Sequence, residues 1–350
     1  MQENENIFNL LKEEEANASR RAMRGVILQP GAIGDCILTL PLAEFMKDRL
    51  GLGGVDILGH TEYTGILPGR TCVDSIRSID SVDLHRLFVE PNTFDLADGD
   101  ALINVFSDYS WIVTFLGEPD SNFERNLIFT ANCSRSVEVI TLPMKPPEKL
   151  SSHITDFYIE QFAAQSGLPS GPTPVCKTKN LIKAAKADIN RGKELLEEIN
   201  AGHSEKLIVI QPGSGGLHKC WHLDNFLSTA KAMASEGADV IFLLGPAEME
   251  RLSTSTISRI ESISKILTNL SLADVLAVLS NANGYIGNDS GITHLAAALG
   301  IQTAAVFGPT DPAVYGPIGP AVTILQSGEP DVNKRPENLQ EKILKALSAN

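Results

Sequence analysis

Lys206-Leu207-Ile208-Val209-Ile210 is a short, mostly apolar run, and the loop Gln211-Pro212-Gly213-Ser214-Gly215-Gly216 follows it directly. A short apolar run that ends at a glycine-rich turn is typical of a buried strand in a parallel sheet. The apolar spacing from Leu223 to Ala234 predicts a helix next, and Asp239 to Leu244 predicts a second strand. This order of strand, glycine loop, helix and strand indicates a parallel sheet with crossover helices.

The same pattern continues on both sides of this stretch. Strands are predicted at residues 284–287 and 303–307, and helices near residues 181–199, 249–260, 272–279 and 293–299. Alternating strands and helices of this kind form a doubly wound sheet with helices on both faces. The C-terminal half is therefore predicted to be a Rossmann-like α/β unit.

The N-terminal half begins in a similar way. Gly25 to Gln29 predicts a strand, residues 30–35 a turn, residues 36–50 a helix and residues 55–59 the next strand. Leu28-Gln29-Pro30-Gly31 in this half matches Ile210-Gln211-Pro212-Gly213 in the other, which suggests two similar units. Further strands are predicted, on weaker patterns, at residues 101–105, 111–115 and 137–140.

Length and linker composition divide the chain into domains. A chain of 350 residues exceeds the usual size of one domain, so two domains are expected. Proline and glycine gather at residues 167–174 and mark the boundary. We therefore predict a polar N-terminal extension at residues 1–24, one Rossmann-like domain at residues 25–175 and a second at residues 176–350.

Composition excludes several classes of protein. The formal net charge of −14 argues against nucleic acid as a partner. The five cysteines are odd in number and never form a Cys-x-x-Cys pair, which favours a reducing cytosol over a disulfide framework or a zinc site. Residues 1–24 lack the pattern of a secretion signal, and no apolar run approaches the ~18–20 residues of a membrane span. A cytoplasmic protein is expected, with at most a peripheral membrane contact.

The clearest candidate ligand loop is Asn288-Asp289-Ser290-Gly291, which lies between a predicted strand and a predicted helix. Glycine allows close approach of the backbone, and the amides and dipole of a helix start favour an anion such as phosphate. His294 lies in the first turn and could donate to a phosphate oxygen. The alternative is structural: Asp289 or Ser290 caps the helix, and His294 packs as a polar core residue.

Two further loops carry compatible chemistry. Residues 213–216 supply glycines and the Ser214 hydroxyl, and Lys219 supplies a cation, which together suit a diphosphate. Glu248 follows the strand at residues 239–244, where a ribose-binding carboxylate often lies. The structural alternatives are a solvated Lys219 and a Glu248 that only stabilises a helix start. Neither a Walker loop nor the dinucleotide fingerprint is present, which argues against an NAD-dependent dehydrogenase.

Asp35 is the candidate general base of the N-terminal half. It follows the first glycine turn, and an ionised carboxylate there could take a proton from an attacking hydroxyl. A helix cap is the structural alternative. The residues alone leave both interpretations open.

Together and in order, four motifs resemble glycosyltransferase family 9, the ADP-heptose:lipopolysaccharide heptosyltransferases. The matching stretches are Gly34-Asp35-Cys36-Ile37-Leu38-Thr39-Leu40-Pro41, Gln211 to Trp221, Gly245-Pro246-Ala247-Glu248, and Asp289 to Gly300 continuing to Pro312. The resemblance covers about residues 26–325. It implies a GT-B fold with two Rossmann-like domains facing across a cleft, and inverting sugar transfer without a metal or other cofactor.

The resemblance also implies roles for individual residues. Asp35 matches the catalytic base, and the donor-binding residues of the family match Ser214, Gly215, Lys219, Glu248, Leu270, Asp289, Ser290, Gly291 and His294. The implied donor is a nucleotide-diphosphate sugar, with ADP-heptose favoured. The implied acceptor is a saccharide or glycolipid hydroxyl such as that of a lipopolysaccharide core, reached at the cytoplasmic face of the inner membrane.

Two departures from the family pattern concern the loops and the acceptor. His222 stands where the family usually has proline, and Gly215 stands where a hydroxyl residue can assist. Residues 25–170 contain 9 Lys+Arg and 20 Asp+Glu, a balance of 9 − 20 = −11, which does not favour a phosphate-rich acceptor. Either the acceptor is a less charged glycan, or the arginines cluster locally: Arg70, Arg77, Arg86, Arg125 and Arg135.

Two other functions fit the same loops. A GT-B-like sugar-nucleotide epimerase would share the donor site but need no acceptor. A non-catalytic sugar-nucleotide-binding protein would keep the C-terminal loops without a working Asp35. Product analysis without acceptor, and an Asp35→Asn variant, distinguish these from a transferase.

Overall fold

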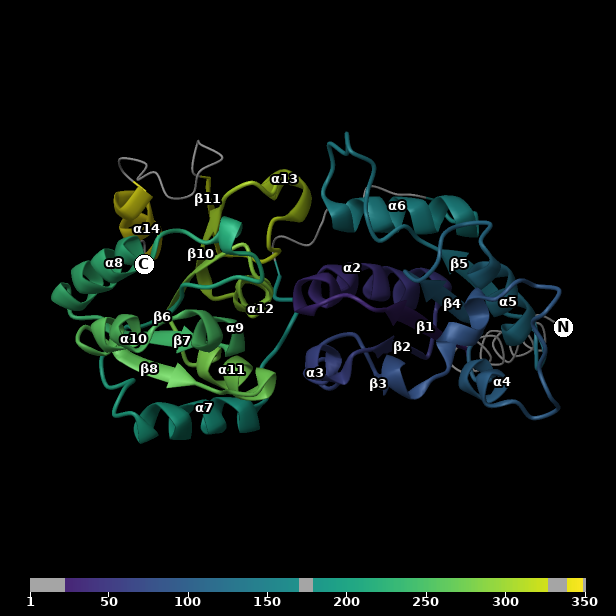
Figure 1. Cartoon of the computed structure of the whole chain (residues 1–350), viewed down its shortest axis with the longest axis horizontal. Coiled ribbons are helices and arrows are strands. Elements are labelled where there is room, and N and C mark those ends of the chain that lie inside the picture. Colours follow the sequence, from purple (N-terminus) through teal and green to yellow (C-terminus); the bar gives the residue numbers. More distant parts are fainter. Residues whose placement is uncertain (1–22, 170–178, 327–338, 349–350) are drawn as a thin grey trace, which may run out of the picture. The chain divides into compact units, whose positions relative to one another are not determined.

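The computed structural model describes residues 23–169, 179–326 and 339–348 (Figure 1). These residues form two compact units. The first contains residues 23–31, 39–148 and 155–169, and the second contains residues 32–38, 149–154, 179–326 and 339–348. The predicted boundary at residues 175 and 176, and all but the last two residues of the predicted extension at 1–24, lie outside the described residues.

The N-terminal unit is built on a five-stranded sheet in the order β3-β2-β1-β4-β5. All neighbouring strands are parallel, so the loops that follow the strands leave the sheet at one edge. The strands are β1 (Arg24–Gln29), β2 (Gly54–Gly59), β3 (Ser75–Ser78), β4 (Trp111–Thr114) and β5 (Glu138–Thr141). The helices are α2 (Ile33–Leu50), α3 (Thr61–Thr64), α4 (Ala101–Phe106), α5 (Asn122–Ala131) and α6 (Ile154–Ser166), with short 3-10 turns at Ile79–Ser81 and Leu84–Phe88. The first residues of α2, up to position 38, and the first residue of α6 group with the second unit.

The predicted strand at residues 101–105 is wrong, because this segment is helix α4. The side chain of Asp100 accepts from the Leu102 backbone N–H at 3.0 Å and caps the helix. Leu102 and Phe106, one helical turn apart, are both buried. A local cap and a packed apolar face thus outweigh the strand preference of the Ile and Val residues.

The C-terminal unit contains a six-stranded parallel sheet in the order β11-β10-β9-β6-β7-β8. Its strands are β6 (Leu207–Gln211), β7 (Asp239–Leu244), β8 (Lys265–Thr268), β9 (Gly284–Asn288), β10 (Gln302–Phe307) and β11 (Val322–Gln326). The helices are α7 (Lys186–Glu198), α8 (Leu223–Ser235), α9 (Pro246–Arg251), α10 (Thr254–Glu261), α11 (Leu272–Leu279), α12 (Gly291–Ala298), α13 (Pro312–Tyr315) and α14 (Leu339–Ser348), with a 3-10 turn at Leu217–Lys219.

Strand order locates the ligand edge of this second sheet. The chain runs from β6 outward through β7 to β8, then returns to the other side of β6 for β9 and β10. The order therefore reverses between β6 and β9, and ligands of open α/β sheets bind at such a reversal, beyond the carboxyl ends of the strands. The loops that follow β6 and β9 carry residues 212–222 and 289–290.

The predicted helix near residues 249–260 is two helices in the structure. Helix α9 ends at Arg251, and the Ser253 side chain then caps α10 by accepting from the Thr256 backbone N–H at 3.2 Å. The serine and threonine residues between them favour a cap over a helix interior, which explains the break.

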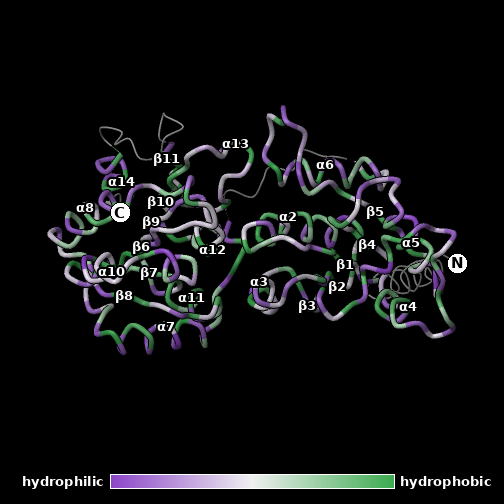
Figure 2. Tube along the Cα trace, viewed as in Figure 1, coloured by the Kyte–Doolittle hydropathy of each residue, from purple (hydrophilic) through white to green (hydrophobic). Residues whose placement is uncertain are grey.

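Each unit has its own apolar core. One core lies among β6, β7, α8 and α14 and includes Ile210, Phe226, Phe242 and Ile343. The other lies among β1, α4 and α5 and includes Leu28, Phe106 and Leu127. Along α7 hydrophobic and hydrophilic stretches alternate, as a helix with one buried face requires (Figure 2). Across the three described ranges, we find no helix with the length and apolar character of a membrane span.

Candidate donor-binding site

Asp289 is the centre of the polar cluster that follows β9 and β6. Its side chain has 9% of its surface exposed and accepts from Lys219 Nζ at 2.7 Å. Its main-chain oxygen accepts from Ser214 Oγ at 2.6 Å. Lys219 is thus an ion-pair partner rather than a solvated lysine, and three predicted donor-binding residues lie together.

Asn288, the last residue of β9, hydrogen-bonds to both ends of the loop that follows β6. Its Nδ2 donates to the Pro212 main-chain oxygen at 2.7 Å, and its Oδ1 accepts from the Trp221 backbone N–H at 2.8 Å. Asn288 and Trp221 are buried, and the Trp221 ring packs edge-on against Phe226 with ring centroids 5.1 Å apart. Trp221 is therefore a packing residue of this unit.

Ser290 and Gln211 belong to a buried hydrogen-bond network between the ends of β6 and β9. Ser290 caps helix α12, as its structural interpretation predicted, and its Oγ also donates to Gln211 Oε1 at 3.0 Å. The Tyr285 hydroxyl donates to the same oxygen at 2.9 Å. On its other side, Gln211 Nε2 lies 3.5 Å from Glu248 Oε1. Gln211 therefore connects the loop of β9 with the carboxylate that follows β7.

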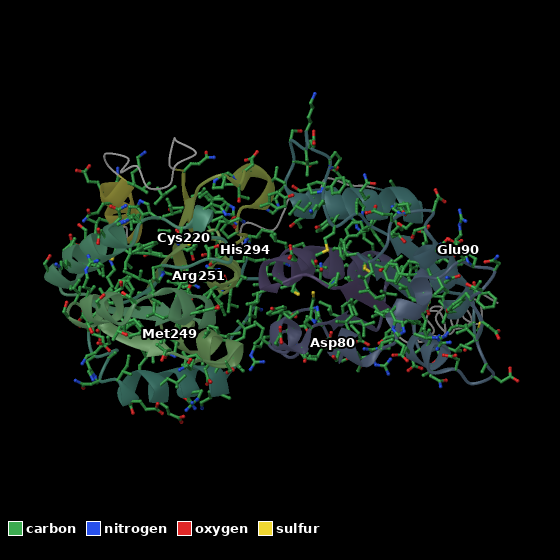
Figure 3. All side chains as sticks on the ribbon, viewed as in Figure 1. Asp80, Glu90, Cys220, Met249, Arg251 and His294 are labelled. Carbon is green, nitrogen blue, oxygen red and sulfur yellow. The ribbon has the colours of Figure 1, made fainter. Side chains whose placement is uncertain are left out.

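His294 lies in the first half of α12 and is 5% exposed (Figure 3). Its Nδ1 has no hydrogen-bond partner among the described residues. Burial lowers the pKa of the imidazole to about 4, and the Asp289 carboxylate opposes this lowering, while His153 and Lys219 add to it. His294 is therefore neutral near pH 7 and able to donate one hydrogen bond.

Glu248 stands in the first turn of α9 and is 6% exposed. Its Oε2 accepts from the Gly245 backbone N–H at 2.8 Å, so the predicted helix-start role of Glu248 is present in the structure. The other carboxylate oxygen packs so closely on Gly213 that a Cβ there would lie 1.3 Å from it. Glycine at position 213 is what allows the carboxylate to reach the loop that follows β6.

Arg251 contacts the glycine loop that follows β6, and the sequence did not predict this contact. Its Nη1 donates to the Ser214 main-chain oxygen at 3.0 Å, and its Nη2 donates to that of Gly215 at 3.2 Å. A cavity of about 380 Å³ lies between α9 and this loop, and its lining includes Gly213, Trp221, Glu248 and Arg251. Arg251 thus holds the glycine loop against the helix that carries Glu248.

The remaining predicted donor-binding residues lie at the same edge of the sheet. Gly291 is the first residue of α12. Leu270 is half-buried in the loop that follows β8, two positions before α11. A Cβ at Gly215 would meet no atom within 4 Å, so its surroundings are open. No group of three His, Cys, Asp or Glu side chains within residues 23–169, 179–326 and 339–348 is arranged to hold a metal ion.

Asp35 lies in the first turn of α2, which begins at Ile33, three residues earlier than predicted. Its Oδ2 accepts from the Ala32 backbone N–H at 3.0 Å. The carboxylate therefore returns to the residue before the helix, as the third residue of a capping box does, instead of being the cap itself. Burial raises the pKa of this carboxyl above the usual range of aspartate, and the Ala32 N–H opposes the shift.

Comparison with known proteins identifies the family of these loops. A family model described as glycosyltransferase family 9 (heptosyltransferase) matches residues 142–345, more than half of the chain. Lipopolysaccharide heptosyltransferase 3 of Escherichia coli is 26% identical over 119 residues, which are 33% of this chain and 35% of that protein. The matched segment therefore spans about a third of this relative.

Solved structures show the same fold over nearly the whole chain. A glycosyl transferase family 9 protein from Veillonella parvula DSM 2008 superposes with a TM-score of 0.71 at 16% identity, covering 93% of this chain and 97% of that one. E. coli ADP-heptose lps heptosyltransferase II gives 0.67 at 15% identity, with coverages of 93% and 99%. E. coli heptosyltransferase WaaC with ADP gives 0.63 at 18% identity, with coverages of 93% and 100%. The predicted pair of Rossmann-like domains is confirmed.

Proposed function

The chain belongs to glycosyltransferase family 9, the heptosyltransferases, and from this we propose that it transfers a heptose or a related sugar from a nucleotide-diphosphate donor to a hydroxyl of a saccharide or glycolipid. ADP-heptose is the favoured donor, because two solved relatives of this fold are named for ADP or ADP-heptose. One observation carries the proposal: Lys219, Ser214 and Asp289 converge where the strand order reverses, beside the start of α12.

The chemistry of this cluster suits a departing nucleotide diphosphate. Backbone N–H groups at a helix start favour an anion, Lys219 supplies a positive charge, and neutral His294 supplies a hydrogen bond. Such groups stabilise the charge that develops on the leaving diphosphate. We propose that they do so without a metal ion, and that Glu248 and Leu270 contact the nucleoside.

Asp35 is the proposed base. As the acceptor hydroxyl attacks the anomeric carbon, the Asp35 carboxylate takes its proton, and the bond between that carbon and the diphosphate breaks with inversion. The burial that raises the pKa of Asp35 makes it a stronger proton acceptor than an ordinary aspartate. We further propose that the reaction takes place in the cytoplasm, at the inner face of the membrane.

A donor screen with the purified full chain tests the proposal. Nucleotide sugars, including ADP-heptose, are incubated with a mixture of saccharide acceptors, and products are identified by mass spectrometry with and without EDTA. We expect an acceptor heavier by one sugar, with free ADP, at equal rates in both conditions. Formation of an epimerised donor in the absence of acceptor would indicate an epimerase. Binding of a nucleotide sugar without any product would indicate a non-catalytic protein. EDTA sensitivity would exclude the metal-independent step.

A further inference from the structure

The arginines of the N-terminal unit are spread over separate contacts. Three of them bind one short helix, α4. Arg86 pairs with Asp100 at the start of α4, with Nη1–Oδ1 and Nη2–Oδ2 distances of 2.9 and 2.8 Å. At the other end, Arg77 Nη1 donates to the Val105 main-chain oxygen at 2.9 Å, and Arg135 Nε donates to that of Ser107 at 2.6 Å.

The other arginines of this unit are also separate from one another. Arg70 Nη1 donates to the Ile66 main-chain oxygen at 3.4 Å. Arg24 pairs with Asp56, and the Arg49 guanidinium lies 5.7 Å from the centroid of the Phe45 ring. Arg125 is exposed in the first half of α5, as Arg49, Arg77 and Arg135 are elsewhere in this unit. These contacts fix helices and strands, and among residues 23–169 they leave no cluster of arginines for a phosphate group.

The loops that leave the carboxyl edge of this sheet carry mainly acids. The first eight residues after each of β1 to β5 contain seven Asp+Glu and three Lys+Arg, a balance of 3 − 7 = −4. The acids are Asp35, Glu62, Asp80, Asp83, Glu118, Asp120 and Glu148, and the bases are Arg86, Lys145 and Lys149. Arg86 is held by Asp100, and both lysines follow β5, the edge strand two places from β1.

The same edge offers groups that suit a neutral sugar. His60 follows β2, the neighbour of β1, and its Nδ1 lies 3.0 Å from Asp80 Oδ2. The rings of His60 and Tyr63 meet edge-on with centroids 6.0 Å apart. Ionised carboxylates accept hydrogen bonds from hydroxyl groups, whereas they repel phosphate. Asp80 is labelled on this unit in Figure 3.

From this distribution we infer that the acceptor presents an uncharged saccharide, without phosphate near the reacting hydroxyl, to the carboxyl edge of the N-terminal sheet. The inference rests on the proposed transferase function, and it names the acceptor class. Arginine forks are the usual recognition groups for phosphate, and here Arg77, Arg86 and Arg135 instead bind groups at the two ends of α4.

Paired acceptors test the inference. A phosphorylated lipopolysaccharide core oligosaccharide is compared with the same oligosaccharide after chemical dephosphorylation, using the full chain and ADP-heptose. We expect kcat/KM to be at least about tenfold higher for the dephosphorylated acceptor, and added salt to narrow the difference because it screens repulsion. Preference for the phosphorylated acceptor, or transfer to neither, overturns the inference.

Charge variants supply a second readout. Glu62→Lys with Asp83→Lys should shift the ratio of the two kcat/KM values toward the phosphorylated acceptor by several-fold, on the order of 10 at low salt. Glu138→Lys, an exposed acid at the start of β5 and hence at the opposite edge, is the matched control and should leave the ratio unchanged. Arg125→Ala should also leave it unchanged; a selective loss on the phosphorylated acceptor would contradict us.

Binding of ADP separates the two proposals. If ADP does not bind, the proposed function fails, whatever the acceptor data show. If ADP binds and sugar is transferred preferentially to the phosphorylated oligosaccharide, the transferase proposal stands and the neutral-acceptor inference fails.

Discussion

Lys219 and Asp289 form an ion pair between a partly exposed cation and a buried carboxylate. The first prediction concerns this pair. Lys219→Ala removes the cation proposed to bind the diphosphate and leaves the 9% exposed carboxylate of Asp289 without it. Hydrogen bonds to charged groups contribute about 1.5–3 kcal/mol, so affinity for ADP should fall on the order of 10- to 100-fold. Calorimetric titration measures this, with Lys231→Ala on the exposed side of α8 as the control.

Asp35 is expected to act on the rate of transfer and not on donor affinity. Asp35→Asn keeps the size of the side chain but removes the proton acceptor, so kcat should fall by about 10²- to 10⁴-fold. Affinity for ADP should change by less than about twofold. A variant that still transfers sugar at the original rate would remove Asp35 as the base.

The buried imidazole of His294 makes stability depend on pH. Its pKa is lowered from 6.5 to about 4 in the folded chain, so the unfolded chain binds the proton more readily. Stability from this group is complete above pH 6.5 and is lost as the pH falls toward 4, by on the order of 3 kcal/mol in total.

The test compares unfolding of two histidine variants at pH 7.5 and pH 5. His294→Gln should reduce the loss of stability between these two values relative to the original chain. His222→Gln is the control, because the His222 side chain is 53% exposed. Equal pH dependence in all three proteins would show that His294 does not carry this effect.

At the scale of elements, the close approach of Gly213 to α9 links the loop after β6 to Glu248. An added methyl group would overlap Glu248 Oε1, which is buried and cannot move freely. Gly213→Ala should therefore lower the free energy of unfolding by about 1–3 kcal/mol. Denaturant unfolding measures it.

Gly215→Ala is the matched control for this variant, two residues along the same loop. A Cβ there meets no atom within 4 Å, so stability should be unchanged within about 0.5 kcal/mol. If both substitutions lowered the free energy of unfolding equally, the loss would come from the loop conformation and not from the contact with Glu248.

Element by element, the sequence predicted what local patterns determine. The strands at β1, β2, β6, β7, β9 and β10 follow apolar runs that end at glycine or polar turns, and these predictions are confirmed. The short edge strand β3 was not predicted, because Ser75-Ile76-Arg77-Ser78 has only one apolar residue. Helix α4 was misassigned because a six-residue element offers too few positions to distinguish helical from strand spacing.

In the candidate site, too, residues that lie in recognisable loops were predicted, and residues brought together by strand pairing were not. Ser214, Lys219, Asp289 and Ser290 were predicted from loops in the correct order, and the structure brings them together. Gln211, Tyr285 and Arg251 were missed as site residues. The hydrogen bond between Tyr285 and Gln211 joins positions 74 apart, and only the pairing of β6 with β9 makes them neighbours.

At the scale of the whole molecule, the two parallel sheets have similar strand orders but differ in the charges at their carboxyl edges. The C-terminal sheet gathers a cation, a buried imidazole and a helix start at its ligand edge. The corresponding edge of the N-terminal sheet carries mainly acids, and three arginines of this unit bind the ends of α4. This difference in charge is the basis of our proposals that the C-terminal unit binds a diphosphate and that the N-terminal unit receives a neutral sugar.

Equilibrium titration of ADP into the full chain tests the central claim most directly, because the claim places a nucleotide diphosphate against Lys219, His294 and the start of α12. We predict saturable binding of one ADP per chain, without added metal, that weakens strongly when Lys219 is replaced by Ala. Absence of binding, or binding that the Lys219→Ala variant retains in full, would contradict the account.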